Sequence, residues 1–476
     1  MSADTRSNIA ASVVLAVLGL MAFWPSVAFD FVNWDDPAYV LHNDLIKSWS
    51  PSNLYGVATE TVTRNYAPLT IFSLLVDHSL WGMNPSGYHA TNVLLHVING
   101  VLVFFLLMQL SGRRFVAFTA AALFLVNPVQ IETVAWISSR KGLLSATFML
   151  AALLVRLKPD KPGHDGWYVL WLAAALMSKA LAVVVPPIVL SYDLWVRKEE
   201  FSKAFARQII PGVMCLLLLL KTMAAQHTVL GGVRGHLEYS LLHIIAIDTV
   251  ILWKYIGMLF YPINLSVLYD PPTTNIAVPV AIASVGWLLV AAALWKTRHR
   301  FPLLLWSAGC FLLLLFPVLN FFRITTLMND RYLYLPSIAV FAVAATAFER
   351  VLVWASSGSI RSDVLKLSSV SLKWSLSVTA VVAAMTLTAQ HLPVWQNATT
   401  LWTHSMRAVP QIPVVRIQMA YTLHDQGQSR EAVRTLQRAL LETEPDQLDR
   451  KRMVATIREW SHELSARSAA RVRARR

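Results

Sequence analysis

Apolar runs long enough to cross a lipid bilayer recur along most of the chain. A transmembrane helix needs about 20 apolar residues, and about eleven runs approach that length. We place the spans at 9–29, 90–110, 115–135, 142–157, 166–181, 182–196, 208–224, 277–295, 302–320, 334–353 and 371–391. Charged residues are only 14% of the sequence, against about 25% in soluble domains. The sequence therefore predicts an all-α polytopic membrane protein.

The distribution of Lys and Arg orients these spans. Cytoplasmic loops of membrane proteins are enriched in both residues, and this rule places the N-terminus inside and the C-terminus outside. The run 9–29 lacks a good cleavage site, so we interpret it as a retained span. The apolar run 240–262 would reverse every later loop if it crossed, so we expect an outer amphipathic or re-entrant helix there.

Several classes of ligand are not indicated. The net charge of +14 fits cytoplasmic loops, so we expect no nucleic-acid partner. Cys215 and Cys310 both lie in apolar runs, which suggests neither a disulfide framework nor a thiolate metal site. His89 and His96 lie seven residues apart on one helix face, but no further ligand has supporting spacing. We interpret them as packing residues, and we predict no cofactor, although a divalent metal stays open.

Two adjacent carboxylates, Asp35 and Asp36, begin a long outer loop over residues 30–88. A carboxylate at the mouth of a span is costly and usually functional. It can act as a general base or hold a cation. The alternative is a solvated turn marked by the Asp-Pro pair at 36–37.

Basic residues also occur at the outer ends of spans, against the positive-inside trend. Such cations need a partner, which could be a carboxylate such as Glu132 or Asp330, or a lipid phosphate. The alternative is snorkelling of long side chains to the headgroups. The residues concerned are Arg140, Lys141, Lys179, Arg323 and Arg331.

Hydropathy falls after residue 391, which divides the chain into a membrane domain (1–391) and an outer helical region (392–476). Residues 414–446 fit a tetratricopeptide repeat, with small residues where two helices must pack closely. Only one complete unit is visible, so we expect it to pack on the membrane domain. An ordinary helical hairpin is the alternative. The matching positions are Ala420, Gly427, Ala432, Ala439 and Pro445.

Six motifs in order make the chain resemble bacterial membrane proteins with C-terminal tetratricopeptide repeats, which are similar to the TMTC-type O-mannosyltransferases. That family in turn resembles the GT-C glycosyltransferases. The motifs are Phe31–Asp36, Asn65–Thr70, His89–His96, Asn127–Lys141, Met177–Lys179 with Asp193–Trp195, and Asp330–Pro336.

The resemblance implies a GT-C-like bundle in the bacterial inner membrane that takes a sugar from a polyprenyl-phosphate carrier on the periplasmic side. The acceptor would be a hydroxyl, first of all a protein Ser or Thr, held by the repeat region. Asp35 or Asp36 would be the general base, and inversion by direct displacement would follow. Arg140, Lys141, Lys179 and Arg331 would bind the carrier phosphate. Further candidate contacts are Arg64, Tyr66, His89, Glu132 and Tyr332.

The sequence departs from this family at three positions. Ala67 stands where Arg or His is usual, Asn127 replaces His, and Gly142 replaces Asp. These departures support a second hypothesis, a non-catalytic membrane scaffold that recruits a partner through the repeat region. A transporter or flippase is a third hypothesis, but it would place charges at the membrane midplane, whereas these lie at the outer ends of spans.

Overall fold

The computed structural model describes residues 2–63, 65–158, 165–227, 239–321, 326–357, 363–443 and 445–473. Over these ranges the chain is helical, and the only β-type pairing is an isolated bridge between Val62 and Asn65. The helices of the first half are α1 (Ala3–Phe23), α2 (Pro51–Thr59), α3 (Pro68–Trp81), α4 (Pro85–Ser111), α5 (Arg114–Val126), α6 (Ile131–Ala135), α7 (Arg140–Arg156), α8 (Asp165–Ser178), α9 (Val185–Trp195) and α10 (Phe201–Ala206). Those of the second half are α11 (Ile209–His227), α12 (Leu241–Phe260), α13 (Ala277–Thr297), α14 (Pro302–Leu315), α15 (Pro336–Ser357), α16 (Asp363–His391), α17 (Ala398–Ala408), α18 (Pro413–Asp425), α19 (Ser429–Glu442) and α20 (Gln447–Arg473).

The predicted all-α, multi-pass membrane architecture is confirmed. Within the described residues, seven helices are long and apolar enough to cross a membrane. An eighth span is possible if α5 and the segment Pro128–Ala135, bent by 53°, count as one. The seven are Asp4–Ala28, Pro85–Ser111, Ile137–Arg156, Leu241–Phe260, Ala277–Thr297, Pro336–Val353 and Ser371–Trp395.

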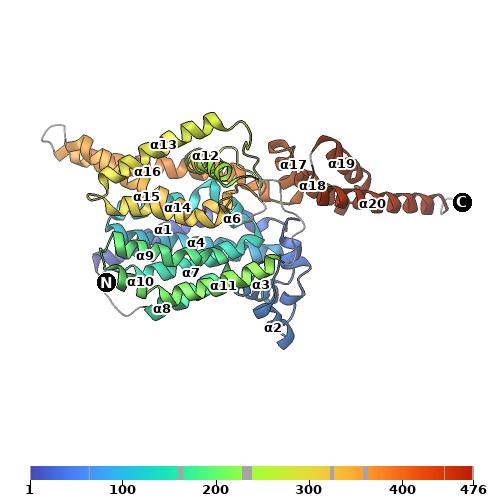
Figure 1. Cartoon of the computed structure of the whole chain (residues 1–476), viewed down its shortest axis with the longest axis horizontal. Helices are drawn as coiled ribbons and strands as arrows, with labels where there is room; N and C mark the ends of the chain where they lie inside the picture. Colours follow the sequence, from blue (N-terminus) through green and yellow to red (C-terminus); the bar gives the residue numbers. More distant parts are fainter. Residues whose placement is uncertain are drawn as a thin grey trace.

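The count of eleven spans is not confirmed. The predicted spans at 166–181, 182–196 and 302–320 correspond to helical segments that are too short to pass the same test, and for 208–224 only the stretch Ile209–Met223 of α11 counts as an apolar helix, which is also too short. Helix α12, in contrast, does pass it. Figure 1 shows α12 strongly foreshortened among helices that run across the view. Its placement along the outer surface stays a prediction.

Helix α4 lies at the centre of the bundle, against α1, α5 and α7. Close approach depends on small residues: a Cβ on Gly100 would lie 2.3 Å from Leu125 of α5. His96 joins two neighbours, because its ring nitrogens lie 2.9 Å from the Tyr334 hydroxyl and 3.0 Å from the Leu125 carbonyl. His96 is therefore a hydrogen-bonded packing residue, as we expected from its spacing.

The first outer loop and the C-terminal helices lie at the same end of the bundle. Figure 1 shows α2, α3, α6 and α17–α20 at the right, and the N-terminus at the left. The two regions are joined directly, since the Asp30 amide donates to the Gln396 carbonyl at 2.9 Å. The structure thus places both regions on one face of the membrane domain, as the predicted topology requires.

The C-terminal helices pack on one another in chain order. Ala420, Ala432 and Ala439 are fully buried between them, and Gly427 makes the turn from α18 to α19 with φ +77°. This positive φ favours glycine, which has no Cβ to clash. The helix–turn–helix agrees with the expected pattern, and its identity as a tetratricopeptide repeat stays a prediction.

Substituting Gly100 with Ala tests the central packing. The added methyl would collide with Leu125, and such overpacking costs about 1–3 kcal/mol, more than the helix propensity gained. We expect a lower thermal unfolding midpoint in detergent. Gly257→Ala in α12 is the matched control, because a Cβ there meets nothing within 4 Å. Equal midpoints for the two variants would contradict this account.

Candidate functional site

The carboxylate of Asp36 fixes the first outer loop to the membrane domain. Asp36 is 1% exposed. One oxygen accepts from the amide and the hydroxyl of Ser138, the former at 3.0 Å, and the other accepts from the Val32 amide at 3.0 Å. Burial raises the pKa of Asp36 to about 6, although these donors favour the ionised form. With both oxygens occupied, Asp36 is suited to holding the loop.

Asp35 has a different environment, although it is the adjacent residue. Its side chain is 31% exposed and lies 3.6 Å from the Lys141 ammonium. Lys141 also lies 3.3 Å from the Tyr39 hydroxyl and 4.6 Å from the centre of the Tyr39 ring. Asp35 therefore has the open surface that a general base requires, and the structure separates two carboxylates that the sequence could not.

Arg331 is held by Glu132, one of its two predicted partners. The guanidinium forms an ion pair with Glu132, and the Arg331 amide donates to the same carboxylate at 2.8 Å. The guanidinium carbon lies 5.5 Å from the Trp136 ring and 5.1 Å from the Tyr332 ring. Positive charge over aromatic faces is favourable. The Arg331 guanidinium is thus held in place, close enough to the Lys141 ammonium to interact with it electrostatically.

Asp330, the other predicted partner, accepts a hydrogen bond from the Tyr269 hydroxyl instead. Burial, and then the neighbouring Glu132 charge, raise the pKa of Asp330 well above its usual value. Asp330 is therefore a hydrogen-bonded structural group rather than a counter-ion for Arg331.

Lys179 lies between α8 and the short turn Ala180–Val184. Its ammonium is 3.9 Å from the position that a Cβ on Gly142 would take, and it is close enough to interact electrostatically with Lys141, Arg331 and Glu132. Within the described residues it has no hydrogen bond or ion pair. Lys141 and Arg331 each have a carboxylate within ion-pair distance, whereas Lys179 has none among the described residues.

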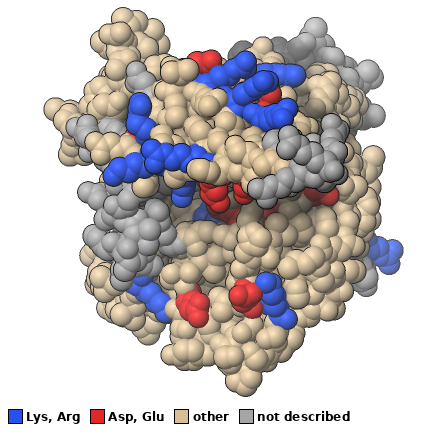
Figure 2. Space-filling view, turned by 90° about the vertical axis from the view of Figure 1, so that its right-hand side faces the viewer, with Lys and Arg blue, Asp and Glu red and all other residues tan. Residues whose placement is uncertain are grey.

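Figure 2 looks onto this end of the molecule and shows acidic and basic side chains gathered along a hollow that crosses its middle. The cluster of Asp35, Lys141, Lys179, Arg331 and Glu132, hereafter the charged cluster, is drawn from four separate parts of the sequence. Such an arrangement can hold an anion next to a carboxylate that accepts protons.

Arg140 occupies a different position from the one predicted for a phosphate ligand. Its side chain is fully buried and forms an ion pair with Asp77 at 2.7 Å. It also donates to the Tyr88 carbonyl at 2.8 Å and to the Asn92 side chain. Arg140 thus joins α3, α4 and α7, and its burial leaves no surface for a lipid phosphate. Asp77 in α3 is its carboxylate partner.

The other predicted contacts are spread out. Arg64 and Arg323 lie outside the described residues. The Tyr66 hydroxyl donates to the Ala58 carbonyl at 2.8 Å, and the Lys221 ammonium lies 3.7 Å from its ring centre. His89 is buried edge-on against Phe29. Of the described members of this group, the structure brings Glu132 and Tyr332 to the charged cluster, and it places Tyr66 and His89 elsewhere.

Sequence reasoning missed Tyr39, Trp136 and Ser138, which hold the charged groups in place. The available signals were the richness of this region in aromatic residues and, for Trp136 and Ser138, their place inside the motif Asn127–Lys141. Asn127, one of the three departures, donates to the Leu259 carbonyl at 3.1 Å and accepts from the Val129 amide at 3.0 Å. It is a satisfied structural residue.

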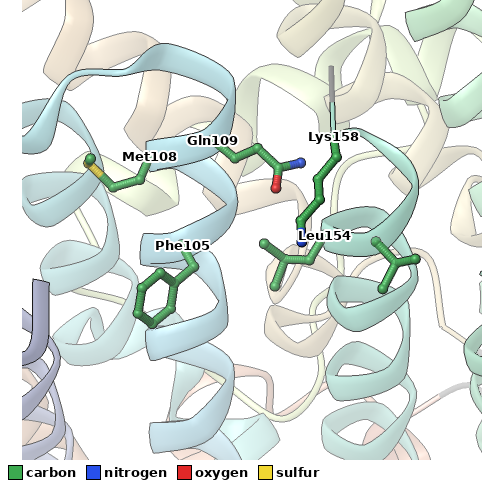
Figure 3. A pocket seen from close by; sticks show the side chains of 6 residues that line it. Phe105, Met108, Gln109, Leu154 and Lys158 are labelled. Atoms are coloured by element: carbon green, nitrogen blue, oxygen red, sulfur yellow. The ribbon is translucent and has the colours of Figure 1, made fainter. Parts of the chain in front are cut away.

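A groove of about 540 Å³ lies between α4 and α7 at the opposite end of these helices (Figure 3). It is lined by Phe105, Met108, Gln109, Leu154, Val155 and Lys158. The charged cluster lies near the N-terminal ends of the same helices, so this groove is separate from the candidate site.

Known proteins resemble this chain over much of its length, although no protein-family model matches it. A Caenorhabditis elegans protein O-mannosyl-transferase, F38B6.6, is 24% identical over 445 residues, covering 88% of this chain and 61% of the relative. Mouse protein O-mannosyl-transferase TMTC2 is 27% identical over 47% of this chain and 29% of its own length. The resemblance to TMTC-type proteins is confirmed, and the chain spans less than two thirds of each of these relatives.

Solved structures show weaker similarity. ArnT from Cupriavidus metallidurans, bound to undecaprenyl phosphate, superposes with a TM-score of 0.41 and 13% identity, covering 86% of this chain and 80% of ArnT. The oligosaccharyltransferase AglB from Archaeoglobus fulgidus, in complex with an inhibitory peptide and a dolichol-phosphate, gives a TM-score of 0.45 and 11% identity, covering 82% and 56%.

The buried Asp36 predicts a pH-dependent stability. Its pKa is 3.8 in an ordinary environment and about 6 here, so between these values the folded state binds more protons than the unfolded state. The wild-type protein should therefore lose stability relative to Asp36→Asn as pH rises from about 4 to about 6, on the order of 3 kcal/mol in total. The thermal unfolding midpoints of the wild type and Asp36→Asn, measured across this pH range, check the direction of this change in stability.

Asp44→Asn is the control for that experiment. Asp44 is exposed, and its hydrogen bond with Lys47 lowers its pKa. As pH rises, the wild type should therefore gain stability relative to Asp44→Asn, whereas it should lose stability relative to Asp36→Asn. A difference between wild type and Asp36→Asn that stays constant from pH 4 to 7 would contradict the assigned burial.

Proposed function

We propose that this protein is a membrane glycosyltransferase that moves a sugar from a polyprenyl-phosphate carrier to an acceptor hydroxyl, first of all that of a Ser or Thr in a protein. The observation on which this depends is the convergence of Lys141, Lys179 and Arg331 beside the partly exposed Asp35. The similarity to protein O-mannosyl-transferases supports it. We place the reaction on the periplasmic side of a bacterial inner membrane, with the N-terminus in the cytoplasm.

In the proposed reaction Asp35 accepts the proton of the acceptor hydroxyl. The hydroxyl oxygen then forms a bond to the anomeric carbon while the bond from that carbon to the carrier phosphate oxygen breaks. The electron pair stays on the phosphate, and nearby cations stabilise its growing charge. Direct displacement inverts the anomeric centre. Asp36 holds the loop so that Asp35 keeps its position.

The cations differ in their availability to the carrier phosphate. Lys141 is 3.6 Å from Asp35, and Arg331 is paired with Glu132, whereas Lys179 has no carboxylate partner among the described residues. We therefore assign Lys179 the first contact with the phosphate, supported by Lys141 and Arg331. Arg140 is excluded by its burial.

The described residues contain no group of three or more His, Cys, Asp or Glu side chains arranged to hold a metal ion. The proposed reaction uses the protein cations Lys141, Lys179 and Arg331 for charge stabilisation. The acceptor protein would be held by the region 392–476, whose helices lie at the same end as the cluster (Figure 1).

Replacing Asp35 with Asn should abolish sugar transfer, because a positioned general base contributes about 10²- to 10⁴-fold. The assay would use protein in lipid nanodiscs with a polyprenyl-phosphate sugar and a Ser/Thr acceptor peptide. Asp44→Asn is the control, because Asp44 also pairs with a lysine on the same outer loop. Full activity of Asp35→Asn, Asp36→Asn and the double variant, combined with loss of function on deleting 410–476, would instead support the scaffold hypothesis.

Replacing Lys179 with Met should weaken polyprenyl-phosphate binding by about 10- to 100-fold, because a hydrogen bond to a charged group contributes about 1.5–3 kcal/mol. Lys47→Met, which removes an exposed lysine of the outer loop, should leave affinity unchanged. Binding is measured by titrating the carrier into nanodisc-embedded protein. Equal affinity for wild type and Lys179→Met would remove Lys179 from the site.

A further inference from the structure

The backbone next to Asp35 is held by the C-terminal helices. The Asn33 side-chain amide donates to the Thr422 hydroxyl at 3.0 Å and to the Gln418 carbonyl at 3.3 Å, both in α18. The Asn33 side-chain oxygen accepts from the indole N–H of Trp402 in α17. One asparagine thus uses both of its polar atoms to join the first outer loop to two helices almost 400 residues away in sequence.

Trp34 extends this contact. Its ring meets that of Trp402 edge to face, with centroids 5.3 Å apart. Trp402 is fully buried, so its indole N–H depends on Asn33 for a partner. An unpaired buried donor is costly, which makes the junction specific.

The next two residues face the membrane domain instead. Asp35 lies beside Lys141 of α7, and Asp36 accepts hydrogen bonds from Ser138 just before that helix. Residues 33–36 are therefore held between two bodies, the C-terminal helices on one side and the start of α7 on the other. The position of the Asp35 carboxylate depends on both.

We infer that Asn33, Trp402 and Thr422, hereafter the clamp, are positioning residues. They use the C-terminal helices to hold the Asp35 carboxylate in its orientation toward Lys141 of the charged cluster. The inference depends on the proposed function for its catalytic consequence. These residues touch neither sugar nor carrier. They act through the backbone of residues 33–36, so their loss should slow the chemical step and leave carrier binding intact.

The sharpest test is Thr422→Val compared with Thr422→Ser. Valine matches threonine in shape but removes the hydroxyl that accepts from Asn33, whereas serine keeps it. We expect kcat to fall about tenfold in Thr422→Val and about 10- to 100-fold in Asn33→Ala, since small misplacements of catalytic groups are costly. KM for the lipid donor should be unchanged, and Thr422→Ser should retain wild-type kcat.

Gln411→Ala is the matched control. Gln411 donates to Asp270 at 3.0 Å and so joins the C-terminal region to a different loop. It should leave kcat unchanged. A purely structural role for the clamp would reduce the yield of folded protein in Thr422→Val without changing kcat per folded molecule, and that result would overturn the inference.

Hydrogen exchange separates this inference from the proposed function. In nanodisc-embedded protein, the peptide containing residues 30–40 should exchange faster in Asn33→Ala and Thr422→Val than in wild type or Gln411→Ala. Faster exchange in Asn33→Ala and Thr422→Val, combined with no sugar transfer by the wild type, would refute the proposed transferase function but support the clamp. Unchanged exchange and unchanged kcat in both clamp variants, with Asp35→Asn inactive, would refute the clamp and leave the transferase.

Discussion

The carboxylate of Asp36 organises the candidate site. A buried carboxylate is costly unless its oxygens are satisfied, and here two backbone amides and one hydroxyl satisfy them. Ser138 lies immediately before α7, so the same hydrogen bonds that satisfy Asp36 bring the first outer loop to the end of a membrane helix. Asp35 and Lys141 meet as a consequence. The site is therefore assembled by a polar contact between a loop and a helix start, where backbone donors are available.

Burial then decides which of the basic residues can act on a ligand. Arg140 and Lys141 are adjacent, but Arg140 points into the bundle and is neutralised by Asp77. Lys141 points to the outer loop, where it lies 3.6 Å from Asp35, and its side chain keeps a small exposed fraction of 13%. A buried pair that is broken by losing one partner destabilises strongly, so Arg140 serves the packing of α3, α4 and α7. The proposed phosphate contacts are therefore limited to the neighbouring cations Lys141, Lys179 and Arg331.

The sequence alone predicts the membrane architecture and much of the site. Hydropathy finds the long helices because the bilayer imposes their length, and charge at span ends points to Asp35, Lys141, Lys179 and Arg331. It cannot assign roles to Asp35 and Asp36, because their difference arises from a hydrogen bond to Ser138 some hundred residues away. The same limit applies to Arg140. Hydropathy also predicts 115–135 as a single span but does not reveal the 53° bend between α5 and Pro128–Ala135.

The glycine at position 142 changes the charge of the site relative to the family pattern. A side chain there would begin 3.9 Å from the Lys179 ammonium, so the change from aspartate to glycine removes a carboxyl group that would start beside this lysine. With glycine, Lys179 has no carboxylate partner among the described residues. A basic residue at the membrane face needs a partner, so this departure is consistent with the proposed contact between Lys179 and a carrier phosphate. It does not by itself favour the scaffold hypothesis.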